Sequence, residues 1–304
     1  MERMGDHLHG PDLGDAPLGS RPTALILSGG AALGSWQGGV LYALEKEYGF
    51  SFHSVAGTSA GCLNGVGYFQ NKTDNLRELW RDIPGGLFMR LAPRLRPPSI
   101  YSQQAIRSYL RTFVDEEACR RSPRCWFYVM SADLCRGLDQ AEYSPEPDGP
   151  WDAPLLEHLL GSVAVPFLFP PVKIPACGGA PRKVLVDGHL TSFVDLPRMV
   201  ERGARDFLFV SVAAKTSLAR PRYNVGGYVS TLVEHMLQGQ IDNSLASLRL
   251  MAPEHGIRAF EFTPARPLNI GVFSFRKEEC RRAFDRGVVD VRNCLRRVPD
   301  YRIY

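Results

Sequence analysis

Short apolar runs alternate with amphipathic segments along the first part of the chain. Residues 23–28 form an apolar run that ends at a pair of glycines, which predicts a buried strand. Residues 35–48 place apolar side chains at helical spacing. A second apolar run over residues 53–56 leads into another helical pattern over residues 59–70. This order predicts a crossover between parallel strands of a sheet that helices cover.

Beyond residue 70 the same two periodicities continue without an internal repeat or a convincing linker. We therefore expect a flexible tail over residues 1–20 and one domain over residues 21–304, with a three-layer α/β/α architecture and a mainly parallel central sheet. The further elements that the pattern predicts are helices over residues 74–82, 102–114, 154–162, 226–250 and 275–297, strands over 126–132, 183–186, 207–213 and 256–262, and loops over 85–99 and 165–171.

Composition excludes several classes of protein. A formal net charge of +4 is too weak to indicate a nucleic-acid partner, although it is compatible with an anionic lipid surface. The seven cysteines are odd in number and lack C-x-x-C spacing, which argues against a disulfide framework or a zinc site. No apolar segment is long enough for a transmembrane helix, and the N-terminus lacks the apolar core of a signal peptide. We expect a cytoplasmic or peripheral membrane protein.

The sequence Gly57-Thr58-Ser59-Ala60-Gly61 stands between a predicted strand and a predicted helix. A serine in this place can sit on a sharp turn with its hydroxyl exposed, and the flanking glycines allow the close approach that the turn needs. The following helix N-terminus favours developing negative charge. Ser59 is therefore a candidate nucleophile, and the alternative is a structural turn with an N-capping serine.

A glycine-rich loop follows the first predicted strand. Gly29, Gly30, Ala31 and Gly34 could present backbone N–H groups to a phosphate or to the oxyanion of an acyl intermediate. Ala31 breaks the strict G-x-G-x-x-G spacing of dinucleotide-binding loops, and no P-loop lysine follows Gly34. The oxyanion interpretation fits better because the loop and Ser59 end neighbouring parallel strands.

Asp187-Gly188-His189 follows the apolar strand that ends at Val186. Asp-Gly is a common turn, but a carboxylate at a strand end could also lie beside Ser59. His189, His235 and His255 follow Ser59 in the chain and are alternative bases for a Ser–His–Asp triad.

Together these segments resemble the patatin-like phospholipase family. Residues 25–41 resemble its oxyanion block, residues 57–61 match its nucleophile elbow, residues 162–172 resemble its Pro-rich block, and Asp187-Gly188 matches its Asp-Gly dipeptide. The family usually has glycine where Ala31 stands, a basic residue where Leu33 stands, and glycine or alanine where His189 stands.

The resemblance implies a lipid acyl hydrolase of the phospholipase A or lysophospholipase type that needs neither a cofactor nor a metal. It implies a Ser59–Asp187 dyad, an acyl-enzyme intermediate and an oxyanion hole in the glycine loop. Gly188 and His189 would form the turn that carries the proton acceptor. The sequence leaves open a Ser–His–Asp esterase, a non-catalytic lipid- or protein-binding member, and the oligomeric state. It also predicts a core-facing apolar stripe on the helix over 226–250 and a solvated basic face on the last helix.

Overall fold

A computed structural model describes residues 18–82, 89–122, 124–176, 181–190, 194–214 and 225–296. In these residues, eight strands form one sheet in the order β10-β9-β1-β2-β5-β8-β7, with β6 also paired to β5. The strands from β10 to β5 run parallel, whereas β6, β7 and β8 join by antiparallel pairs. The strands are β1 (Thr23–Leu27), β2 (Ser54–Thr58), β5 (Trp126–Asp133), β6 (Gly137–Tyr143), β7 (Val172–Ile174), β8 (Lys183–Asp187), β9 (Asp206–Val210) and β10 (Arg258–Phe262).

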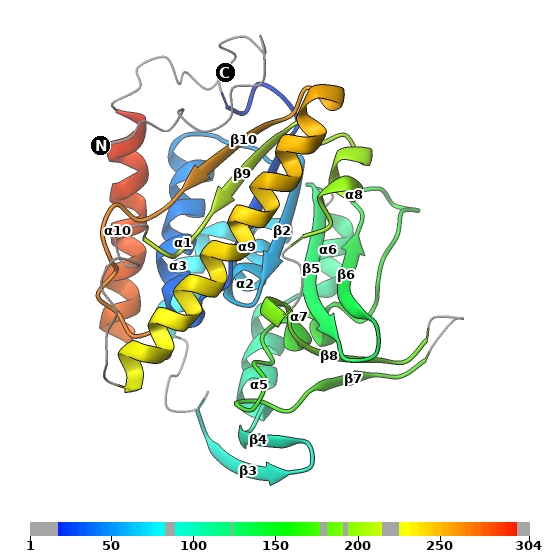
Figure 1. Ribbon diagram of the computed structural model, residues 1–304, viewed down its shortest axis with the longest axis vertical. Helices are drawn as coiled ribbons and strands as arrows, with labels where there is room; N and C mark the ends of the chain where they lie inside the picture. The colour runs from blue at the N-terminus through cyan, green and yellow to red at the C-terminus, as the bar shows by residue number, and fades with distance from the viewer. Residues whose placement is uncertain are drawn as a thin grey trace.

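Helices cover both faces of the sheet, as the alternation of buried residues along β1 requires (Figure 1). Leu25 and Leu27 belong to one core cluster, and Ala24 and Ile26 belong to another. The first cluster packs α1 (Gly34–Tyr42), α2 (Ala60–Phe69), α3 (Leu76–Asp82), α5 (Gln104–Phe113), α6 (Glu116–Arg121), α7 (Leu155–Ser162) and α10 (Lys277–Leu295), and the second packs α8 (Leu196–Glu201) and α9 (Val225–His255). The predicted three-layer α/β/α architecture is confirmed.

The segment over residues 85–99 departs from the prediction. Its described part is not a simple loop but contributes to an antiparallel hairpin of β3 (Leu91–Leu95) and β4 (Pro98–Tyr101). The hairpin lies apart from the main sheet at one end of the molecule (Figure 1). Proline is tolerated here because an isolated hairpin has free edges where a missing N–H donor breaks no ladder.

Two apolar-pattern predictions need smaller corrections. The predicted helix over 35–48 is α1 followed by a π-helical turn over Ala43–Glu47. The stripe predicted on α9 faces the core only in part, because Leu237 and Ile241 are buried whereas Leu232 and Met236 are exposed. Most of the predicted tail over residues 1–20 lies outside the described residues.

The last helix is packed closely on the first. A Cβ atom on Gly39 would lie 2.0 Å from the Phe284 carbonyl oxygen, and one on Gly287 would lie 2.1 Å from the Trp36 carbonyl oxygen. Only glycines permit α1 and α10 to approach so closely. The Trp36 indole N–H also donates to Asp290 Oδ2 at 2.9 Å. The C-terminal helix therefore holds α1, whose N-terminus lies next to the glycine loop.

Candidate active site

Ser59 occupies a strained turn between β2 and α2. Its φ of 53° lies in the left-handed region, which a non-glycine residue rarely adopts. Gly61 allows this turn, because a Cβ there would lie 2.3 Å from the Leu27 carbonyl oxygen. Gly57 is equally constrained by the backbone of Gly61. This arrangement has the backbone geometry expected of the predicted nucleophile elbow, with Thr58 and Ala60 as the flanking residues.

The glycine loop lies beside this elbow, with three N–H groups that remain available. The N–H groups of Ser28, Ala32 and Leu33 donate to backbone carbonyls. Those of Gly29, Gly30 and Ala31 have no partner in the part of the chain that the structure describes. The Gly34 N–H is already bonded to the turn formed by Ala31 and Ala32. Of the four residues predicted for the oxyanion hole, Gly29, Gly30 and Ala31 keep N–H groups without a partner in the described chain, whereas the Gly34 N–H serves the turn.

Asp187 ends β8, and strand β5 lies between β8 and β2 in the sheet. In the sheet, Thr58 is in register with Met130 of β5, and the next residue of β5, Ser131, is in register with Asp187. A Cβ on Gly188 would lie 3.1 Å from Thr58 Cγ2, so the Asp-Gly turn touches the elbow strand. Asp187 is 2% exposed and Ser59 is 6% exposed. Sheet register thus brings both predicted catalytic residues to the same buried edge.

The Asp187 carboxylate is hydrogen-bonded to His189. Asp187 Oδ1 lies 2.6 Å from His189 Nδ1 and accepts the His189 backbone N–H at 3.1 Å. Among the described residues, no hydrogen bond joins Asp187 to Ser59. Asp187 Oδ2 and His189 Nε2 are both buried and lack a partner there. Within the described chain, two buried polar atoms of this pair thus lack a hydrogen-bond partner, which is unusual for buried polar groups.

The imidazole of His189 fills the space that a side chain at position 29 would occupy. A Cβ on Gly29 would lie 2.5 Å from His189 Nε2 and 2.9 Å from Ser59 Cβ. The glycine loop, the elbow and the histidine therefore meet at one point. The other histidines offered by the sequence do not share this position, because His235 and His255 are exposed on α9.

Ser162 is a site residue that the sequence motifs did not single out. Its hydroxyl accepts the Ser59 N–H at 2.9 Å and donates to the Met130 carbonyl at 2.6 Å. Two residues later, the Ala164 carbonyl accepts the Asp187 N–H at 2.9 Å. The end of α7 and the start of the Pro-rich segment therefore hold the backbones of both candidate catalytic residues. The position of Ser162 at the head of the Pro-rich block is the one signal that could have indicated it.

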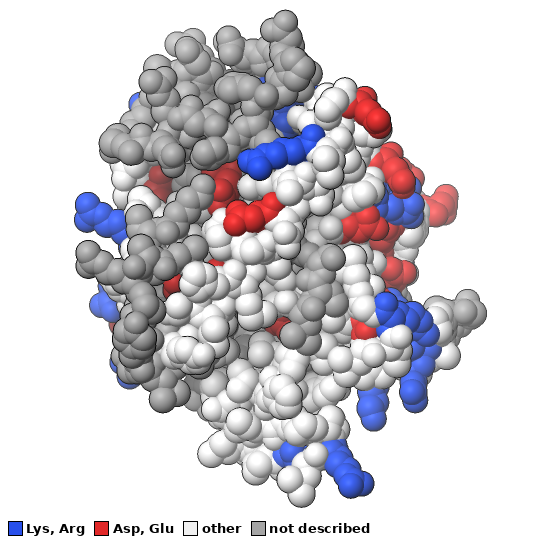
Figure 2. Space-filling model, viewed as in Figure 1, with Lys and Arg blue, Asp and Glu red and all other residues white. Residues whose placement is uncertain are grey.

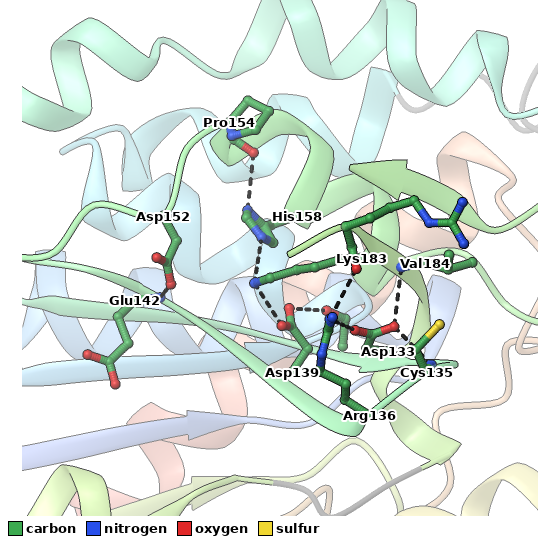
Figure 3. A network of polar contacts seen from close by, with 12 residues as sticks. Asp133, Cys135, Arg136, Asp139, Glu142, Asp152, Pro154, His158, Lys183 and Val184 are labelled. Carbon is green, nitrogen blue, oxygen red and sulfur yellow. Dashed lines mark hydrogen bonds and ion pairs between the residues drawn. The ribbon is translucent and has the colours of Figure 1, made fainter. Parts of the chain in front are cut away.

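A second polar network supports α7 from the opposite end (Figure 3). Lys183 Nζ donates to Asp139 Oδ1 at 2.8 Å and approaches His158 Nε2 at 3.4 Å. His158 Nδ1 lies 2.9 Å from the Tyr143 hydroxyl and 3.2 Å from the Pro154 carbonyl oxygen. Burial, and then the nearby Lys183 ammonium, lower the pKa of His158. The surroundings therefore favour the neutral form of His158 over the charged form.

The described residues contain no cluster of three or more His, Cys, Asp or Glu side chains that could hold a metal ion. Their helices include none whose length and apolarity suit a membrane span.

The fold and site define a class of protein: a three-layer α/β protein with a strained, buried serine between a glycine loop and a strand-end aspartate. The sequence model of patatin-like phospholipases matches residues 25–199, more than half of the chain, and the chain belongs to this family. Family membership implies lipid acyl hydrolase activity.

Solved structures include a match to the crystal structure of VipD from Legionella pneumophila, with 12% sequence identity and a TM-score of 0.38. The alignment covers 91% of this chain and 67% of that chain. At this TM-score the likeness carries no argument. The curated proteins contain no match.

Proposed function

We propose that the protein cleaves fatty-acyl esters of phospholipids or lysophospholipids through a serine acyl-enzyme. The observation that carries the proposal is the strained turn at Ser59, beside the N–H groups of Gly29, Gly30 and Ala31, which have no partner within the described residues. Ser59 is buried and has a positive φ at the start of helix α2. This backbone geometry points a nucleophilic hydroxyl toward the place where an acyl carbon can bind.

The reaction would proceed in two halves. The Ser59 oxygen attacks the ester carbonyl as its proton leaves, and the glycine-loop amides stabilise the oxyanion. The tetrahedral intermediate collapses, and the alcohol of the lipid departs with a proton. Water then attacks the acyl-enzyme in the same way, which releases the fatty acid and returns the proton to Ser59.

Asp187 is the proton acceptor in the simplest form of this mechanism. His189 holds Oδ1, which leaves the buried Oδ2 without a partner among the described residues. That free oxygen supports direct proton transfer from Ser59 in a dyad. In this form His189 orients the carboxylate but does not exchange a proton with the substrate.

A second form makes His189 the base and Asp187 its orienting carboxylate. The contact between Asp187 Oδ1 and His189 Nδ1 is the one that orients histidine in Ser–His–Asp triads. The ring lies beside Ser59 and its Nε2 is unpartnered in the described chain. This observation favours a histidine relay as the alternative to the dyad.

Labelling with a fluorophosphonate tests the proposed function, since only an activated serine reacts. We expect labelling of the wild type and none of Ser59→Ala. We expect Asp187→Asn to lose fatty-acid release from phospholipid and lysophospholipid by about 10⁴-fold while it stays folded by circular dichroism. A wild-type protein that is folded yet unlabelled would favour the non-catalytic, lipid- or protein-binding alternative.

The substitution His189→Gly separates the two forms, because glycine is a usual family residue at this position. The dyad predicts that this variant keeps activity within about tenfold of wild type. The relay predicts a loss as large as that of Ser59→Ala. A variant that is as inactive as Ser59→Ala, but equally well folded, would replace the dyad with the relay.

A further inference from the structure

The β3–β4 hairpin exposes large apolar side chains at one end of the molecule. Leu91 is 71% exposed, Leu95 is 92% exposed and Ile100 is 44% exposed. Phe167, which forms an isolated bridge with Ser99 of β4, is 69% exposed. Such a concentration of exposed apolar side chains marks a surface that a partner covers.

The segment that contains the hairpin and helix α5 carries charges of one sign. Residues 89–114 contain five arginines, no lysine, and neither aspartate nor glutamate. Arg90, Arg94 and Arg96 are exposed, and in the described part of the chain none of them forms an ion pair. The face shown in Figure 2 carries blue and white atoms, but no red ones, at the end that the hairpin forms. An anionic partner fits this surface.

Two other candidate surfaces lack this combination. The arginines of α10 are largely paired, as in the contacts of Arg281 with Glu278 and of Arg292 with Glu47. The exposed Leu232 and Met236 of α9 lie in a stretch, residues 225–241, whose one charged side chain is that of Glu234. The hairpin therefore combines basic side chains that form no ion pair in the described chain with exposed apolar area, a combination absent from residues 225–241 and from the paired arginines of α10.

The hairpin is joined by backbone hydrogen bonds to the segment that holds the active site. The N–H groups of Ile100 and Tyr101 donate to the carbonyls of Phe167 and Leu168 at 3.0 and 2.8 Å. Three residues before Phe167, the Ala164 carbonyl accepts the Asp187 N–H. A surface that meets the hairpin thus lies at the end of the fold where the Pro-rich segment reaches the catalytic edge.

We propose that the β3–β4 hairpin, with Phe167, is the surface on which this protein docks to an anionic lipid bilayer. The leucines and Phe167 enter the boundary between headgroups and acyl chains, and the three arginines contact the lipid phosphates. The choice of a bilayer as the partner rests on the proposed lipid hydrolysis. Docking here places the catalytic edge next to the lipid that it would cleave.

Vesicle sedimentation tests the proposal in a Ser59→Ala background, so that hydrolysis does not alter the lipid. The probes are vesicles of phosphatidylcholine alone and of equimolar phosphatidylcholine and phosphatidylglycerol. We expect binding to the anionic vesicles, weakened by salt. We expect Arg94→Glu with Arg96→Glu to weaken it at least tenfold, since each cation near the surface contributes about fivefold. Leu91→Ser with Leu95→Ser should also weaken it at least tenfold.

Matched controls are Arg282→Glu on α10 and Leu250→Ser on α9, both exposed and outside the hairpin. They should bind vesicles like the parent protein. The hairpin substitutions, made with Ser59 restored, should leave hydrolysis of a soluble p-nitrophenyl ester unchanged. If the wild-type protein does not hydrolyse that ester, the result would count against the proposed function but not against membrane docking.

Three outcomes would overturn the docking proposal. The first is equal binding of the parent and both hairpin variants. The second is an equal loss in the hairpin variants and the controls. The third is a parent protein that binds neither kind of vesicle and instead forms a hairpin-dependent dimer in sedimentation velocity. A second copy of the chain would then cover this surface.

Discussion

At the scale of single residues, the geometry of the site depends on glycines that lack a side chain and on one serine hydroxyl that joins two segments. Gly29 leaves the space that His189 and Ser59 share, and Gly61 lets α2 approach β1. Ser162 ties the elbow to β5 through two hydrogen bonds of one hydroxyl group. In the proposed mechanism each of these residues sets the position of a reacting group, so each should affect turnover more than it affects the fold.

Gly29→Ala should reduce turnover of a soluble ester by about 100-fold, in the range seen when one oxyanion donor is lost. The added Cβ would lie 1.8 Å from His189 Cε1, so the ring or the loop must move. Steady-state kinetics beside Gly271→Ala, where the nearest atom is 3.4 Å away, would check this. Equal activity of the two variants would mean that His189 and the loop do not define the site.

Ser162→Ala should lower kcat about 10- to 100-fold with little change in KM, because the elbow backbone loses its fixed position. The buried Ser59 N–H would also lose its partner, at a cost of about 1–2 kcal/mol in the free energy of unfolding. The matched control is Ser54→Ala on β2, the strand that leads into Ser59, since the buried Ser54 hydroxyl has no partner among the described residues. A parallel loss in the control would remove the assigned role of Ser162.

At the scale of elements, the strands and helices that position the site could be predicted from periodicity and glycine placement. β1, β2, α2 and β8 agree with the sequence-based ranges to within about two residues, which is the usual uncertainty of element boundaries. Among the missed strands, β6 lacks a regular alternation, because Leu138, Ala141 and Tyr143 do not follow a period of two, and β7 has three residues. The place of Asp187 near the elbow and the role of Ser162 depend on contacts between segments far apart in the sequence, which no local pattern reveals.

The folded protein should lose stability in mild acid because of His158 on α7, the helix that supports the proposed catalytic edge. His158 is neutral in the fold because its pKa is held below the ordinary value of 6.5. The unfolded chain therefore takes up the proton first as the pH falls below about 6.5. The stabilising contribution is full above that pH and is lost toward the folded pKa, at no more than about 1.4 kcal/mol per pH unit.

Urea unfolding between pH 7 and pH 5 would measure this dependence. His158→Gln, which removes the titrating group, should show a shallower loss of stability than wild type. His255→Gln, on an exposed part of α9, should keep the wild-type slope. Identical slopes in wild type and His158→Gln would show that the Lys183 network does not couple folding to pH.

At the scale of the whole molecule, the part of the chain beyond the family match completes the sheet. The match ends at residue 199, yet β9 pairs with β1, β10 pairs with β9, and α10 packs on α1. Without β9, the strand that leads into the glycine loop would be an unpaired edge. We therefore expect the described residues to unfold as the single domain that the sequence predicts.

The substitution Gly287→Ala on α10, the last helix, tests whether the described residues unfold cooperatively. The new Cβ would lie 2.1 Å from the Trp36 carbonyl oxygen, a backbone atom that cannot turn aside, so the free energy of unfolding should fall by about 1–3 kcal/mol. Gly239→Ala, with no atom within 4 Å, should be neutral or stabilising by up to about 1 kcal/mol. If α10 and the sheet form one unit, tryptophan fluorescence and far-ultraviolet circular dichroism must shift together in the Gly287→Ala variant. Separate transitions would mean that α1 and α10 unfold while the sheet stays folded. The cooperative unit that holds the site would then be smaller than the single domain that the sequence predicts.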